Sequence, residues 1–452
     1  MQIPQTRFSA HSTVNPAGAF SEEHYIRIDL AIEWEERGGK LVDYTIHAGK
    51  VIDGSSGPPM NDVRIEVEKG KIVHIESTLS TSPGPTKPKG KVIHLESLTV
   101  LPGLIDCHVH LTLPGQDLPL TDYVNSPDVV LGAVAAQNGM KALRAGITTV
   151  RDCGGKGRTT IDLSHAVKAG YVQGPTIVSC GAPLTITGGH CWFWGGEADG
   201  IDDVRHQVRE LSKSNADYIK VMASGGGTPG TCAWLPSYTA KELQVITEEA
   251  HHLGKKVVVH SLNTKATENA IAAGVDEIEH AHGWVDAQGT QDVQPEIANA
   301  IAKAGIRVCE TLSVNWSLIE FVRKKAKVTE EDEQLLQSRE TMHESLLQQL
   351  KLLVDAGVKI VAGTDAGWRV TPFDALTNEL ILMHQGGLSR SQAILSATSQ
   401  AAEAIGLADQ KGRLAKGYDA DIIAVDGDPL ESLEALRQIR FVMKSGSVIY
   451  SE

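Results

Sequence analysis

The sequence lacks the long apolar runs that are typical of membrane proteins. No segment reaches the roughly 20 consecutive apolar residues that a membrane-spanning helix needs. The first thirty residues carry polar and charged groups where a signal peptide needs an apolar core. We therefore expect a cytoplasmic protein with no membrane partner.

Positive charge and paired cysteines are also scarce. The 452 residues include 42 lysines and arginines against 56 aspartates and glutamates, which gives a formal net charge of −14. Because nucleic acids and anionic membranes repel an acidic protein, we expect neither as a partner. The six cysteines show no paired spacing typical of a zinc ribbon or a disulfide framework, so we expect free thiols.

Three patterns divide the chain. Residues 1–40 show no clean period and predict an irregular arm. Short alternating strands in residues 41–100 and 407–452 predict a small discontinuous β-sandwich domain built from both ends of the chain. Residues 101–406 alternate apolar strands with amphipathic helices. Eight such units predict an α/β fold of the (β/α)8 TIM-barrel type.

The barrel prediction depends on where each strand ends, because reacting groups gather at the C-terminal ends of barrel strands. We place the eight strand ends at His110, Val150, Ser179, Met222, His260, His280, Glu310 and Asp365.

One expected helix is Arg339–Ala356, and the charged run before it, residues 324–333, is interpreted as a surface loop or a helix start.

The stretch LPGLIDCHVHLT, residues 101–112, contains two histidines at alternate positions of an apolar strand. The period of two in a strand sends His108 and His110 to the same side, where two neutral imidazoles can bind a metal. An isolated pair of this kind is more often structural. Here the strand is expected to be buried, where charge-capable groups are costly unless they are bound, so we favour a metal site.

Further ligand-capable residues stand at the ends of other strands. Any one of these histidines alone would more often be structural, and their joint occurrence at equivalent barrel positions carries the prediction. The six candidate ligands are His108, His110, Lys220, His260, His280 and Asp365.

Lys220 is unusual because an unpaired ammonium in an apolar strand is costly and would repel metals. One interpretation is a lysine paired with a buried carboxylate. The other is a lysine whose amine has reacted with CO₂, giving a carbamate that can bridge two metal ions.

The motifs LPGLIDCHVH, YIKVMASGG, VVVHS, EIEHAH and IVAGTDAG resemble the amidohydrolase superfamily of metal-dependent hydrolases. Within it, the chain is most similar to the branch of imidazolonepropionase-like and Xaa-Pro or Xaa-Arg dipeptidase-like proteins. The resemblance implies a binuclear site, usually zinc, and relatives are often homo-oligomers. One metal would be held by His108, His110 and Asp365, and the other by His260 and His280. Carboxylated Lys220 and a hydroxide would bridge them.

Roles in catalysis follow from the same resemblance. Asp365 would take the proton of the hydroxide as general base and deliver it to the leaving amine as general acid. His190, in a GGH element, would bind the substrate carbonyl or its oxyanion. Candidates for contacts with a small-molecule substrate are His190, Trp192, Trp194, Trp234, Tyr238 and Arg369, with Arg158 as a further arginine near the predicted mouth.

Three functions are compatible with the sequence. The first is hydrolysis of a C–N amide-type bond in a dipeptide, an N-acyl amino acid, or an amide, urea or carbamate compound. The second is a mononuclear cyclic-amide hydrolase or deaminase of the imidazolonepropionase type, which Lys220 argues against because those relatives lack the bridging lysine. The third is a non-catalytic scaffold, whose signature would be lost ligands, and none is lost here.

Overall fold

The computed structural model of the chain describes residues 42–78, 90–117, 120–283, 286, 290–292 and 294–451. The predicted N-terminal arm, residues 1–40, lies outside the described residues. All six cysteines are free, as predicted. None of the helices in these described ranges combines the length and apolar character needed to cross a membrane.

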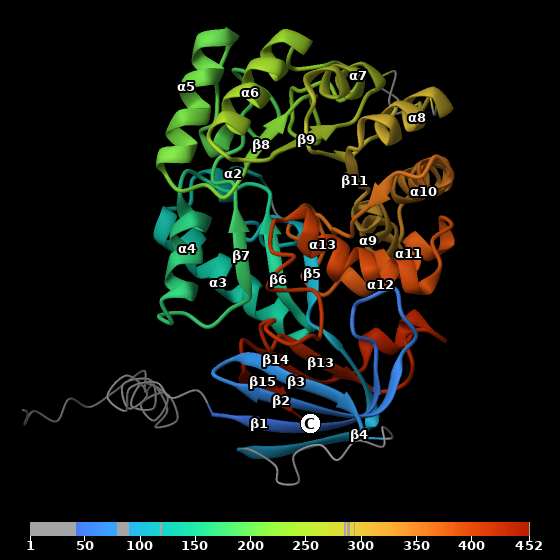
Figure 1. Cartoon of the computed structure of the whole chain (residues 1–452). Coiled ribbons are helices and arrows are strands. Elements are labelled where there is room, and N and C mark those ends of the chain that lie inside the picture. The colour runs from blue at the N-terminus through green and yellow to red at the C-terminus, as the bar shows by residue number, and fades with distance from the viewer. Residues whose placement is uncertain are drawn as a thin grey trace, which may run out of the picture. The chain divides into compact units, whose positions relative to one another are not determined.

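Strands from both ends of the chain form one seven-stranded sheet (Figure 1). Its order is β15-β14-β13-β4-β1-β2-β3, and only the β1–β4 pair is parallel. The strands are β1 (Tyr44–Val51), β2 (Met60–Glu68), β3 (Lys71–Ser77), β4 (Lys91–Pro102), β13 (Ile422–Val425), β14 (Ile439–Lys444) and β15 (Ser447–Ser451).

This sheet is continuous, where the sequence predicts the two sheets of a sandwich. The cause is β4, whose 12 residues pair with β1 and, through Thr99–Pro102, also with β13. The two arms of the sheet nevertheless share one apolar core, to which Ile46 and Ile65 contribute from one arm and Phe441 from the other.

Eight parallel strands lie at the predicted places in the chain and form two sheets, but the last one, predicted to end at Asp365, ends at Ile360. The backbone N–H of Asp217 donates to Ser179 O at 2.8 Å beside one junction of the sheets, and that of Cys107 donates to Ala362 O at 2.9 Å beside the other. The three-stranded sheet contains β5 (Leu104–Val109), β6 (Ile147–Asp152) and β7 (Thr176–Ser179). The five-stranded sheet contains β8 (Ile219–Met222), β9 (Val257–Ser261), β10 (Glu277–His280), β11 (Arg307–Cys309) and β12 (Lys359–Ile360).

Helices separate successive parallel strands, as the period of the apolar residues predicted (Figure 1). Gly274 and Gly305 end two of them with positive φ angles of 70° and 69°, which a residue without a side chain adopts at little cost. The helices include α3 (Asp128–Arg144), α4 (Thr159–Lys168), α5 (Gly200–Lys213), α6 (Ala240–His252), α7 (Thr264–Ala273), α8 (Pro295–Ala304) and α11 (Leu376–Gln385). Shorter elements are α2 (Leu120–Val124), α12 (Arg390–Ser396), α13 (Ser399–Ala404), and the 3-10 turns η1 (Trp192–Trp194) and η2 (Leu433–Arg437).

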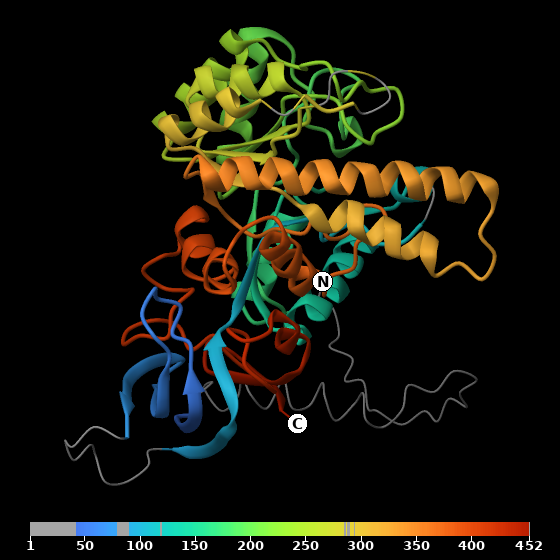
Figure 2. The ribbon, with the colours of Figure 1, turned by 90° about the vertical axis from the view of Figure 1, so that its right-hand side faces the viewer.

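The helical hairpin after β11 differs from the sequence prediction. Two helices run side by side, α9 (Leu312–Arg323) and the 26-residue α10 (Glu330–Asp355), and Figure 2 shows them extending together in gold and orange. Placing the start at Arg339 was therefore wrong. The helix begins at a capping box, in which the Thr329 hydroxyl accepts from Asp332 N and the Asp332 carboxylate accepts from Thr329 N.

Candidate active site

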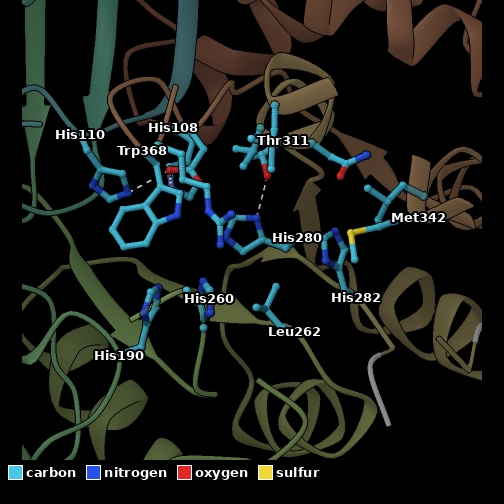
Figure 3. Close-up of a pocket in the computed structure, with 18 of the residues that line it drawn as sticks. His108, His110, His190, His260, Leu262, His280, His282, Thr311, Met342 and Trp368 are labelled. Atoms are coloured by element: carbon cyan, nitrogen blue, oxygen red, sulfur yellow. Dashed lines mark hydrogen bonds and ion pairs between the residues drawn. The ribbon is translucent and has the colours of Figure 1, made fainter. Parts of the chain in front are cut away.

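The six predicted ligands line one cavity of about 220 Å³ (Figure 3). Four of them lie on or directly after β5, β8 and β9, and the others end β10 or follow β12. Since the carboxyl ends of parallel strands meet at one edge, residues far apart in the sequence converge.

Two histidines and one carboxylate lie close enough to hold a cation. The Asp365 Oδ1 atom lies 3.1 Å from His110 Nε2 and 3.5 Å from His108 Nε2. One ligand atom each of His108, His280 and Asp365 lie within 4.8 Å of one another. The His260 ring is 4.7 Å from the His280 ring, so the cluster of imidazoles continues to β9.

Each of the four imidazoles turns one nitrogen towards a protein oxygen. For His110, His260 and His280 this contact is a hydrogen bond, which orients the ring and leaves the other nitrogen for a ligand. The neighbours are Gly154 O, 3.1 Å from His110 Nδ1; Gly225 O, 3.2 Å from His260 Nε2; Thr311 Oγ1, 2.7 Å from His280 Nδ1; and Glu279 Oε1, 3.2 Å from His108 Nδ1. Burial lowers the pKa of His108, His260 and His280 well below the usual value, so these rings are neutral and keep a lone pair.

Lys220 is paired with a buried carboxylate that the sequence interpretation did not identify. Its Nζ contacts Glu279 Oε2, and burial lowers the pKa of this lysine. Glu279 Oε1 also lies 3.3 Å from Arg151 Nη2 and accepts a hydrogen bond from Cys153 Sγ at 3.1 Å. The signal was present in the sequence, because charged residues in the strand EIEH and in β6 are costly unless they meet each other.

A second buried carboxylate, that of Asp106, connects β5 to the segment that follows β12. Asp106 accepts hydrogen bonds from the backbone N–H groups of His108 and Thr364, both at 3.1 Å, and from the Thr364 hydroxyl at 2.6 Å. Burial raises the pKa of Asp106 to about 7. Asp365 and His280 have positive φ angles of 56° and 67°, which is uncommon for residues with a side chain and frequent at functional sites.

His190 lines the same cavity, and its ring lies 4.7 Å from that of His260. Thr228 Oγ1 accepts from the backbone N–H of Cys191 at 3.0 Å and lies 2.8 Å from His190 Nδ1. If the Thr228 hydroxyl donates to Nδ1, His190 carries its proton on Nε2. Burial lowers the pKa of His190 to about 3, so the ring is a neutral donor.

The predicted aromatic contacts are placed differently. Trp192 is 42% exposed and Trp234 is half-buried. Trp194 donates its indole N–H to Tyr123 Oη and packs behind His110, and Tyr238 donates to Ala198 O, so both rings are held by the framework. None of these four is among the described residues that line the cavity, whereas Trp368, which we did not predict, is.

The remaining cavity surface comes mainly from the hairpin of α9 and α10. We call this surface the helical wall, and Figure 3 shows its Met342 beside His282. Arg369 also lines the cavity, whereas Arg158 pairs with Asp162 at 3.0 Å and is exposed. The helical wall consists of Val314, Asn315, Leu318, Arg339, Met342 and Leu346.

Comparison with known proteins identifies the family. The sequence pattern of the amidohydrolase family matches residues 99–450. The chain belongs to the amidohydrolase family. Like its relatives, this amidohydrolase is a hydrolase acting on C–N bonds, which confirms the predicted enzyme class.

Individual relatives confirm the predicted dipeptidase-like branch. Ochratoxinase from Aspergillus niger is 29% identical over 447 residues, covering 89% of this chain and 86% of the relative. A crystal structure of a Xaa-Pro dipeptidase with methionine in its active site has a TM-score of 0.77 at 28% identity, covering 90% and 100% of the two chains. Imidazolonepropionase from Rhizobium rhizogenes is 24% identical over 358 residues, covering 72% of this chain and 77% of the relative.

Proposed function

We propose that this chain is a binuclear metal-dependent amidohydrolase that cleaves a C–N amide-type bond in a small molecule. The candidate substrates are a dipeptide, an N-acyl amino acid, or an amide, urea or carbamate compound. The observation that carries the proposal is the convergence of neutral, buried imidazoles on the carboxylate of Asp365, within 4.8 Å for the ligand atoms of His108, His280 and Asp365. The similarity to ochratoxinase and to a Xaa-Pro dipeptidase supports amide-bond cleavage.

The chemistry of these side chains fits two divalent cations, with zinc as the expected metal. His108, His110 and Asp365 would hold one ion and His260 and His280 the other, with carboxylated Lys220 between them. Two such ions lower the pKa of a water molecule and polarise a carbonyl group. Asp365 Oδ1, buried and without a hydrogen-bond donor among the described residues, is the orphaned oxygen expected of a ligand.

Carboxylation of Lys220 has a consequence for Glu279. The ammonium that now contacts Glu279 would become an anionic carbamate, and two buried anions in contact repel each other. Glu279 would then take up a proton or turn entirely to Arg151, which lies 3.3 Å away.

Two side chains would carry the proton transfers and charge stabilisation. Asp365 accepts a proton from the attacking water and delivers it to the leaving amine. His190 donates from Nε2 to the carbonyl oxygen as negative charge develops there. Trp368 lies 5.4 Å from His190, ring to ring, and limits the access of other water.

The alternatives are retained with the observations that weigh on them. The similarity to imidazolonepropionase favours a mononuclear cyclic-amide hydrolase or deaminase, and the presence of Lys220 on β8 opposes it. A non-catalytic scaffold is opposed by the presence of all six ligand candidates around one cavity. We also propose that the two parallel sheets close into one TIM barrel, that the seven-stranded sheet forms a sandwich-like domain, and that the protein forms a cytoplasmic homo-oligomer.

Metal content and Lys220→Ala test the binuclear site. We expect two ions per chain in the natural protein. In the variant, we expect loss of the second ion and a rate about 10³-fold lower, because a metal contributes several kcal/mol to charge stabilisation. Lys213→Ala is the matched control, since Lys213 lies on the surface and pairs with Glu210. Full metal occupancy and full rate in Lys220→Ala would contradict the binuclear mechanism.

A release assay tests the reaction itself. Metal-loaded protein is offered N-acyl amino acids, Xaa-Pro and Xaa-Arg dipeptides, aryl ureas and carbamates, and the released amine is quantified. Turnover of at least one class is expected. Absence of turnover in every class, with two metals bound, would count against the assignment.

A further inference from the structure

We propose that Arg339, assisted by Arg369, forms an anion site in the cavity that binds a carboxylate of the substrate. The inference rests on the proposed amide-bond hydrolysis and narrows its substrate class. It favours N-acyl amino acids and dipeptides over neutral ureas, carbamates and amides.

Charge in the cavity runs against the charge of the whole chain. The formal net charge of the protein is −14, yet the described charged residues lining the cavity are Lys220, Arg339 and Arg369 against Asp365 alone. Lys220 is already neutralised by Glu279. Apart from the two proposed metal ions, the two arginines are therefore the positive charges in the cavity that are left for a ligand.

Neither guanidinium has an ionic partner in the described part of the chain. No carboxylate among those residues lies within 4.0 Å of Arg339 or Arg369, whereas Arg158 and Arg209 on the surface each have one. Asp365 and Asp117 attract Arg369 from farther away. Among the described residues, Arg339 Nε is buried without a hydrogen-bond partner, and the same guanidinium donates only to the Met342 sulfur, at 3.5 Å. An unsatisfied buried donor of this kind is costly unless a ligand supplies the acceptor.

The two arginines come close enough to repel each other. Burial and, as the smaller cause, the repulsion of the nearby Arg369 guanidinium together lower the pKa of Arg339 to about 10. Two like charges held together without a counter-charge are stabilised when an anion binds between them. A guanidinium presents its donors in a planar fork that matches the two oxygens of a carboxylate.

Both side chains are carried by ordered backbone. Asn315 Nδ2 on α9 donates a hydrogen bond to Arg339 O on α10 at 2.9 Å. This bond between the helices is additional to the hydrogen bonds within α10, and it connects the two helices at Arg339. Arg369 stands in a tight turn after Asp365, with a φ of 50°, closed by the bond from Trp368 N to Asp365 O at 3.1 Å. The backbone at both arginines is therefore anchored, and Arg369 lies in the turn that begins at Asp365, which suits a site that positions the scissile bond.

The surroundings favour an organic carboxylate. Arg339 is half-buried among Leu318, Met342 and Leu346 of the helical wall, which offers apolar contact to the rest of a substrate. Arg369 is more exposed, so Arg339 is expected to contribute the larger share.

The test compares an acid with its neutral isostere. N-benzoyl-L-phenylalanine and N-benzoyl-L-phenylalaninamide are offered to the metal-loaded protein, and benzoate release gives kcat/KM for each. If neither is turned over, the acid and amide forms of any N-acyl amino acid or dipeptide that is turned over replace them. We expect a preference for the acid of about 10- to 100-fold, as a charge-assisted hydrogen bond gives.

Variants separate recognition from folding. Arg339→Met is expected to lower kcat/KM for the acid by about 10- to 100-fold, mainly through a higher KM. The value of kcat/KM for the amide should change by less than about threefold. Arg339→Lys should restore part of the preference for the acid. Arg158→Met is the matched control, and kcat/KM for both substrates should stay unchanged in it. If Arg339→Met does not fold, judged by its thermal unfolding, Arg369→Met supplies the same comparison with a smaller expected loss.

Two results would overturn the inference. One is an equal decrease of kcat/KM for the acid and the amide in Arg339→Met, which would indicate a structural role of Arg339. The other is that the protein cleaves neutral ureas or carbamates alone. Both leave amide-type hydrolysis intact. Failure of the proposed function looks different, because no compound, acid or neutral, would then be cleaved.

Discussion

The two sides of the cavity differ in how their polar groups are satisfied. We call the side formed by His108, His110, His260, His280 and Asp365 the histidine side. One nitrogen of each of the four rings faces a protein oxygen, as His110 Nδ1 faces Gly154 O at 3.1 Å and His280 Nδ1 faces Thr311 Oγ1 at 2.7 Å. On the helical wall, Arg339 Nε and Asn315 Oδ1 are buried without a hydrogen-bond partner among the described residues. The histidine side also keeps buried atoms without such a partner, but these include Asp365 Oδ1, which belongs to a candidate metal ligand, whereas those of the helical wall belong to side chains with no proposed metal role.

This difference separates two tasks. Metal ligands must keep one orientation, which a hydrogen bond to the remote ring nitrogen provides. A recognition surface gains affinity from groups whose partners arrive with the ligand. Changes on the histidine side should therefore affect kcat and metal content, and changes on the helical wall should affect KM.

The largest effect in this comparison is expected for His190→Ala. Removing one donor to a developing oxyanion costs about 10²- to 10³-fold in kcat, and His190 is placed as that donor. Metal content should stay unchanged, since His190 is bound to Thr228 Oγ1 and is not among the proposed ligands. Metal analysis beside steady-state kinetics checks this, and loss of an ion in the variant would make His190 a ligand instead.

Glu279→Gln should give an intermediate effect. Glu279 contacts Lys220 and lies 3.2 Å from His108 Nδ1, so the change should weaken metal affinity by about 10- to 100-fold, measured by competition with a chelator. Glu277→Gln is the matched control, because Glu277 also contacts Arg151. Neither Lys220 nor His108 is among its contacts in the described part of the chain.

Both glutamate variants are expected to unfold at lower temperature. Each leaves part of the buried charge of Arg151 uncompensated, which costs about 3–5 kcal/mol when a buried pair is broken. If Glu277→Gln weakens metal binding as much as Glu279→Gln, the effect travels through Arg151, and Glu279 has no direct role in placing the ligands.

The histidine side could be predicted from the sequence for a physical reason. In a parallel α/β arrangement, the last residue of each strand faces the same edge, so an apolar run followed by a histidine or an aspartate fixes both the strand and the site. His260 at the end of VVVH and His280 at the end of EIEH are examples. Glu279 was missed because its role depends on Arg151 and Lys220, which approach it from other strands.

The helical wall could not be predicted in the same way. Its residues come from α9 and α10, whose placement depends on the packing of one helix against the other and on the bond from Asn315 to Arg339 O. The start of α10 had a local signal in the Thr329–Asp332 capping box, but no local signal indicates that Arg339 lines the cavity. The four aromatic residues predicted as substrate contacts are not among the described residues that line the cavity, for a related reason: the Trp194 indole N–H, for example, donates to Tyr123 Oη, which lies far away in the sequence.

The smallest effect is expected for Met342→Ala on the helical wall. The change removes apolar contact from the cavity without touching the ligands, so KM should rise by about tenfold for substrates with a large acyl group and kcat should stay within about twofold. Substrates with an acetyl group should change little, because they do not fill the space beside α10. The kinetic comparison uses benzoyl and acetyl forms of one amino acid.

Met342→Leu is the control for this last variant, since it keeps the volume and removes the sulfur that lies 3.5 Å from Arg339 Nη1. If Met342→Leu behaves like the natural protein, the apolar volume sets KM. If it raises KM for benzoyl and acetyl substrates alike, the sulfur contact holds Arg339 in place, and the wall acts through the arginine rather than through apolar contact with the acyl group.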